Sequence, residues 1–64
     1  MTEPTLQVLA NAVVRLGLDC ADAMGRGDTP RGRRLAEIIG DLYGAYPGLR
    51  AAVEREIRVG EAAP

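Results

Sequence analysis

Two carboxylates and one thiol are the side chains of this sequence whose types and spacing could do chemistry. Asp19 and Asp22 lie three residues apart, so a helix would place both on one face, as paired carboxylates lie in general acid–base catalysis. A lone pair of this kind on a polar helix face is far more often solvated surface. Cys20 reacts only as a thiolate, and it falls in an apolar stripe with no cation predicted beside it.

Missing residue types argue further against catalysis. The 64 residues include no His, Lys or Ser and a single Cys, so the common general base, most nucleophiles and a zinc ligand set are lacking. No glycine-rich phosphate loop follows a strand, because the pattern predicts no strand. We therefore expect a protein that is not an enzyme, with no catalytic residue, no metal site and no cofactor.

Charged residues carry the most informative pattern, because their signs oppose the helix dipole. Asp19 and Asp22 fall near the end of a first predicted helix. Three arginines fall near the start of a second: Arg31, Arg33 and Arg34. The dipole disfavours each placement by about 0.3–1 kcal/mol. Three interpretations stay open: the two groups neutralise each other across the loop, the arginines bind an acidic partner protein, or they bind nucleic-acid phosphates.

Two tyrosines and one glutamate are the remaining contact candidates. Tyr43 and Tyr46 are the only aromatic residues, and tyrosine is enriched at the centres of protein interfaces. The alternative is that both cap a small core with their hydroxyl groups at the surface. Glu56 lies in the apolar arc of a third predicted helix. A salt bridge with an Arg, or a contact with a basic group of a partner, would account for a charged residue at that position.

The spacing of apolar residues predicts an all-α fold, a small three-helix unit that forms a single domain over 1–64. Segments rich in Gly and Pro separate the helical patterns. Thr29 is expected to cap the second helix, with Pro30 in its first turn. Pro47 either kinks one helix or separates two, and Gly60 is expected to end the last one. The predicted helices and the frayed tail are 3–24, 30–45, 47–59 and 61–64.

The first helix is apolar around most of its circumference. Its main stripe has the spacing of a and d positions in a coiled coil: Leu6, Leu9, Val13, Leu16 and Cys20. Beside that stripe, Ala10, Gly17 and Ala21 form a strip of small residues that another backbone could approach. Two short helices offer too little apolar surface to cover so much. We therefore expect a long, mostly buried first helix and self-association as a homodimer through the a/d stripe.

A helix-turn-helix is the alternative motif. Leu35-Ala36 followed by Ile39-Gly40 matches its first helix and turn, and the segment 25–34 holds four Arg and one Asp. The match fails over 41–47, where Pro47 would break the recognition helix and base-reading side chains are missing. This partial match makes a small DNA-binding regulator the alternative function.

Composition points to a small globular chain. Hydrophobic residues make up 47% and charged residues 27%, and the net charge of −1 gives no global attraction to nucleic acid or acidic membranes. No apolar run of about 18 residues is present, so we expect no membrane span. One Cys and no signal-peptide pattern favour the cytoplasm. Arg26-Gly27-Asp28, the tripeptide that integrins bind, is then interpreted as a coincidence in a glycine-rich turn.

Together these observations favour protein–protein interaction as the function. We expect a small non-catalytic adaptor, accessory subunit or inhibitor of a larger complex, which acts by occupying a surface. Phage-encoded inhibitors of host complexes are proteins of this kind. Nucleic acid is the less favoured partner. The candidate residues for binding a protein partner are Arg31, Arg33, Arg34, Tyr43 and Tyr46.

Overall fold

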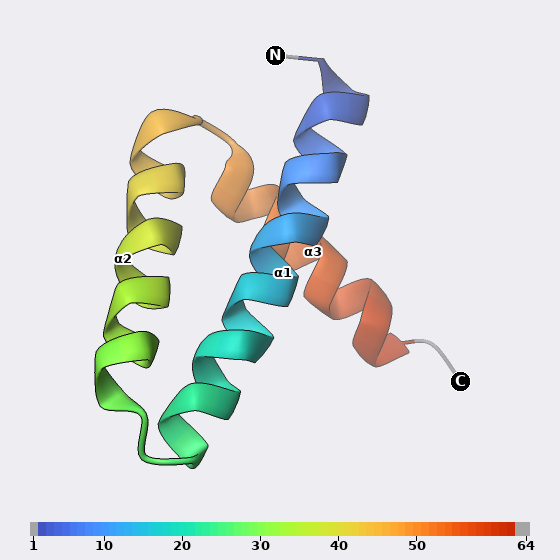
Figure 1. The fold of residues 1–64 in the computed structure, drawn as a ribbon. Helices are drawn as coiled ribbons and strands as arrows, with labels where there is room; N and C mark the ends of the chain where they lie inside the picture. The colour runs from blue at the N-terminus through green and yellow to red at the C-terminus, as the bar shows by residue number, and fades with distance from the viewer. Residues whose placement is uncertain (1, 63–64) are drawn as a thin grey trace.

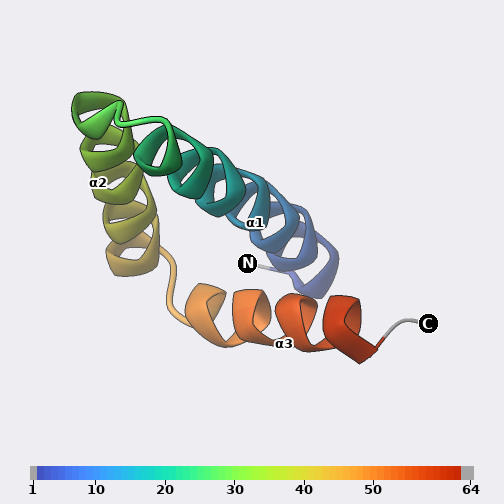
Figure 2. The same ribbon diagram turned by 90° about the horizontal axis from the view of Figure 1, so that it is seen from below.

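Three helices make up the chain, as the spacing predicts (Figure 1). The structure, a computed structural model, describes residues 2–62, and no strand occurs in that range. The helices are α1 (Glu3–Gly25), α2 (Thr29–Ala45) and α3 (Leu49–Ala62). α1 and α2 lie side by side and antiparallel, and α3 crosses α1 (Figure 1, Figure 2). The prediction of an all-α, three-helix fold is confirmed.

Pro47 separates α2 from α3. Tyr46 follows α2 in an extended conformation, with φ −123° and ψ 96°, as is favoured before a proline. Gly48 has φ +88°, in the left-handed region that favours glycine. The backbone N–H of Leu49 then donates to the Tyr46 carbonyl at 3.1 Å. α3 begins at Leu49 rather than at the predicted Pro47, because a left-handed residue cannot belong to a right-handed helix.

The end of α3 also differs from the prediction. Gly60 does not stop the helix, which continues to Ala62. A glycine weakens a helix by roughly 1 kcal/mol relative to Ala. Gly60 is not among the glycines with positive φ, so nothing in its backbone turns the chain. Of the tail predicted to fray, Glu61 and Ala62 are helical, and 63–64 lie outside the described residues.

The core lies where α3 crosses α1. Leu49 is 0% exposed and packs with Val13 and Val53 and with two alanines, Ala10 and Ala52. Ala10 is also fully buried, because its small side chain lets α3 come close to α1. Half-buried apolar side chains surround this cluster: Leu6, Leu9, Val14, Ile39, Leu42, Tyr43 and Tyr46. α2 therefore contributes only half-buried residues to the core.

Two polar contacts tie α3 to the N-terminal turns of α1. The side-chain amide of Gln7 donates to the Glu56 carboxylate, and Arg55 pairs with Glu3 at 3.7 Å. The salt bridge with an Arg that was one expectation for Glu56 is not formed among residues 2–60, because the helix crossing brings the amide of Gln7 to it. Exposed polar contacts contribute at most about 1 kcal/mol each. The position of α3 rests mainly on the apolar core.

α1 is mostly exposed, which contradicts the prediction of a mostly buried first helix. Only Ala10, Val13 and Ala23 are buried, whereas Val8 and Leu18 are 68% and 66% exposed. The reason is the flat arrangement of the helices, whose Cα atoms span 36 × 33 × 13 Å. α2 and α3 pack on α1 and hardly touch each other, so much of the α1 surface stays open (Figure 2).

The a/d stripe predicted for self-association faces the other helices of the same chain. Val13 belongs to the core, and Leu6 and Leu9 pack against it. Leu16 and Cys20 are half-buried, and the Cys20 thiol donates to the carbonyl oxygen of Gly32 in α2 at 3.2 Å. An a/d spacing marks the side of a helix that meets its neighbours. It does not tell whether those neighbours belong to the same chain.

Two glycine substitutions should change the stability in opposite directions. A Cβ on Gly40, inside α2, would have no atom within 4 Å, so Gly40→Ala should raise the free energy of unfolding by about 0.5–1 kcal/mol. Gly48→Ala should lower it by about 1–2 kcal/mol, because alanine is strained at φ +88°. Urea unfolding followed by far-UV circular dichroism measures both. Stabilisation by Gly48→Ala would contradict the turn described above.

Candidate functional site

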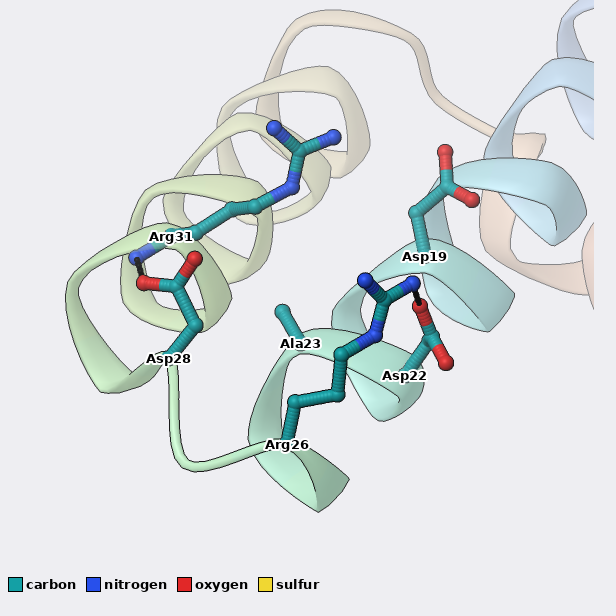
Figure 3. A pocket seen from close by; sticks show the side chains of 6 residues that line it. All are labelled: Asp19, Asp22, Ala23, Arg26, Asp28 and Arg31. Carbon is teal, nitrogen blue, oxygen red and sulfur yellow. Dashed lines mark hydrogen bonds and ion pairs between the residues drawn. The ribbon is translucent and has the colours of Figure 1, made fainter.

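The turn between α1 and α2 gathers charged side chains around an open pocket of about 290 Å³ (Figure 3). The pocket is lined by Asp19, Asp22, Ala23, Arg26, Asp28 and Arg31. Asp19 and Arg31 lie on opposite sides of it (Figure 3). The two charged groups predicted from the sequence are therefore brought to the same end of the molecule.

Asp22 pairs with Arg26, one helical turn further along, and not with the arginines of α2. Both side chains are exposed. The hydrogen bond that Arg26 donates to Asp22, together with the negative charge of Asp22, raises the pKa of Arg26 above its ordinary value. Spacing at i, i+4 is the sequence signal for this pair. Of the three open interpretations, neutralisation across the loop does not apply to Asp22, because the nearer guanidinium of Arg26 pairs with that carboxylate.

Asp28 caps α2. Its carboxylate accepts a hydrogen bond from the backbone N–H of Arg31 at 3.3 Å, so the cap is one residue earlier than the predicted Thr29. A carboxylate here also interacts favourably with the helix dipole. The Asp of the tripeptide Arg26-Gly27-Asp28 thus has a structural role in beginning α2.

Arg31, Arg33 and Arg34 form an exposed surface at the start of α2, which we call the arginine surface. Among the side chains of residues 2–60, none of their guanidinium groups forms an ion pair within 4.0 Å, whereas Arg26, Arg50 and Arg55 do. Asp19 is likewise in no ion pair there. The positive N-terminal end of the α2 dipole adds to the three charges. The arginine surface therefore carries three positive charges that no ion pair engages, with the carboxylates of Asp28 and Glu37 lining the same pocket.

Tyr43 and Tyr46 lie near the other end of α2, away from the arginine surface. Ten residues of helix separate Arg33 from Tyr43, a rise of about 15 Å. Both tyrosines are half-buried against the core. The guanidinium carbon of Arg50 lies 5.9 Å from the centre of the Tyr43 ring, within range of a cation–π interaction. The five predicted partner-binding residues therefore do not form one site.

An apolar groove opens among all three helices, and we call it the three-helix groove. Its volume is about 320 Å³. Two of its side chains are exposed, Leu18 at 66% and Ile57 at 46%. Beside the core it is lined by Val14, Gly17, Leu18, Ile39, Tyr43 and Ile57. Leu18 lies outside the a/d stripe, so the spacing did not select it. The excess of apolar residues on the first helix was the only signal for it.

The turn that a helix-turn-helix requires at Gly40 does not exist, since α2 is continuous from Thr29 to Ala45. No cluster of three or more His, Cys, Asp or Glu side chains that could hold a metal occurs among the described residues. None of the three helices, as described, is long and apolar enough to cross a membrane. The chain matches no protein-family model, no curated protein and no solved structure.

Loss of the Asp28 cap should destabilise the protein. Asp28→Ala should lower the free energy of unfolding by about 1 kcal/mol, because the N–H of Arg31 loses its partner. Thr29→Ala is the matched control and should change it by less than about 0.5 kcal/mol. Thermal unfolding measures both variants. A larger loss of stability in Thr29→Ala than in Asp28→Ala would show that Thr29, and not Asp28, is the N-cap of α2.

Proposed function

We propose that this chain is a small non-catalytic protein–protein interaction protein, an adaptor, accessory subunit or inhibitor, that binds an acidic surface of a larger partner through the arginine surface. The observation that carries the proposal is that Arg31, Arg33 and Arg34 are exposed and form no ion pair with any side chain of residues 2–60. Arginine is enriched at interface hot spots, because its planar group binds carboxylates through two hydrogen bonds.

The nearby acidic groups support this assignment because they have other contacts. Asp22 is paired with Arg26, and Asp28 accepts a hydrogen bond from the backbone of α2. Three adjacent positive charges at a helix N-terminus then form no ion pair, and the two carboxylates that line the same pocket, Asp28 and Glu37, are outnumbered by them. A complementary acidic surface on another protein would supply it and would speed the encounter.

A protein partner is favoured over nucleic acid for two reasons. The net charge of −1 gives the whole molecule no general attraction to phosphates. α2 also passes through Gly40 without the turn of a DNA-binding motif. The proposed setting is the cytoplasm, where the free thiol of Cys20 would stay reduced.

Charge reversal of the arginine surface should abolish partner binding. The tagged chain, incubated in nuclease-treated lysate of the organism that encodes it, is expected to retain one protein complex. The triple variant Arg31→Glu, Arg33→Glu, Arg34→Glu should lose that complex. Arg15→Glu, an exposed arginine on α1, is the control and should keep it. Mass spectrometry of the bound fraction identifies the partner and measures its retention.

Two results would contradict the proposal. Equal retention by the triple variant would show that the arginine surface is not the interface. Binding that is lost on nuclease treatment would favour the DNA-binding alternative. In that case the affinity for a DNA duplex should fall steeply with added salt, because each neutralised phosphate releases counterions.

A further inference from the structure

Two sulfur-containing side chains of α1 contact one glycine of α2, and that glycine lies between two residues of the arginine surface. Gly32 is the one buried residue of α2, and its chain neighbours are Arg31 and Arg33. The Cys20 thiol donates to the Gly32 carbonyl oxygen at 3.2 Å. A Cβ added at Gly32 would lie 2.7 Å from Cγ of Met24 and nearer still to its sulfur. Met24 therefore lies directly on the Gly32 backbone, where another residue would have its side chain.

The contact between Met24 and Gly32 joins the end of α1 to the first turn of α2. Gly32 belongs to that turn, where its backbone N–H donates to the Asp28 carbonyl oxygen at 3.0 Å. The same turn carries Arg31 and Arg33, which are both exposed. Because Gly32 has no Cβ, the flexible Met24 side chain can pack closely on the helix backbone. The position of the arginine surface relative to α1 thus depends in part on a thioether.

Met24 is also open to solvent, with 51% of its surface exposed, whereas Cys20 is half-buried. A peroxide converts an accessible thioether to methionine sulfoxide, which is polar and disrupts apolar packing. The sulfur lone pair attacks one peroxide oxygen, and the O–O bond breaks. The departing hydroxide takes the proton of the transferred oxygen and leaves as water. The sulfur is oxidised in this step, and the peroxide is reduced.

We propose that Met24 is an oxidation site that regulates the arginine surface. Hydrogen peroxide converts its thioether to the sulfoxide, the contact with Gly32 weakens, and the first turn of α2 loosens from α1. Arg31 and Arg33 then lose their fixed positions, and binding of the acidic partner weakens. A methionine sulfoxide reductase reverses the change, with the sulfoxide oxygen leaving as water while two thiols form a disulfide. Only the effect on partner binding rests on the proposed function.

Peroxide treatment of the complete chain tests the site through its stability. Hydrogen peroxide should add one oxygen atom to Met24, as located by tandem mass spectrometry. The Tm should fall by about 4–8 °C, the shift that a modest loss of packing causes in a small domain. Met24→Leu is the matched control, because leucine fills a similar volume and has no sulfur. Its Tm should not respond to peroxide, although it keeps Cys20 and Met1. Dithiothreitol is added before each measurement, because it reduces a sulfenic acid or disulfide at Cys20 and leaves the sulfoxide intact.

NMR locates the structural change without any substitution. On oxidation, the amide signals of Arg31 and Gly32 should shift, and that of Ala52, in the core between α1 and α3, should not. Methionine sulfoxide reductase with dithiothreitol should restore the signals and the Tm, whereas dithiothreitol alone should not. In the lysate experiment described above, oxidised wild type should retain less of the partner than oxidised Met24→Leu.

Four results would overturn the proposal. Met24 that stays a thioether, while free methionine in the same solution is fully oxidised, would show that peroxide does not reach it. An oxidised wild type with an unchanged Tm and unchanged amide signals would show that the sulfoxide leaves the contact intact. An equal loss of Tm in Met24→Leu would assign the effect to another residue. Full partner retention by the oxidised wild type, where the triple arginine variant retains none, would exclude the regulation.

Failure of the proposed function gives a different result. A fall in Tm on oxidation, together with full partner binding by the triple arginine variant, would support the oxidation site and reject the arginine surface as the interface.

Discussion

The close packing of Leu49 on Ala10 is the contact on which the rest of the structure depends. Leu49 is the one large side chain, among the described residues, that is completely buried. It reaches α1 because Ala10 has almost no side chain there and because the left-handed Gly48 turns the chain just before it. α2 and α3 touch little, so the angle between them depends mainly on how each packs against α1. The arrangement of the groove follows from that crossing.

Charge and apolar surface are divided between two regions of the molecule. Around the first turn, Asp22 is paired with Arg26 and Asp28 accepts a hydrogen bond from the backbone of α2, whereas Arg31 and its neighbours form no ion pair. Around the groove, Arg50 is engaged by Glu54 and Tyr43, which leaves mainly apolar atoms exposed. The two regions have different chemistry, and one can be altered without changing the other.

The helices and their bounds could be predicted from the sequence, whereas the contacts between helices that lie far apart in the sequence could not. Apolar spacing and Pro47 gave three helices, and the bounds of the first two agree to within one residue. The a/d stripe correctly marked the packed side of α1, but spacing carries no information on which helix covers it. The pair of Asp22 and Arg26 has the i, i+4 spacing that a helix favours, whereas Glu56 meets Gln7, 49 residues away, only because α3 crosses α1. The burial of α1 was overestimated because its apolar residues outnumber those that two short helices can cover.

The scarcity of contacts between α2 and α3 also bears on how the chain folds. Helices α1 and α2 meet through a short turn, and such local contacts form within microseconds to milliseconds. Leu49 must join them from further along the chain. Until it does, Ala10 and Val13 face water, and the α3 of a neighbouring chain could occupy their site as well as the native one. In the folded chain, the tight connection at Pro47 and Gly48 places α3 on its own α1.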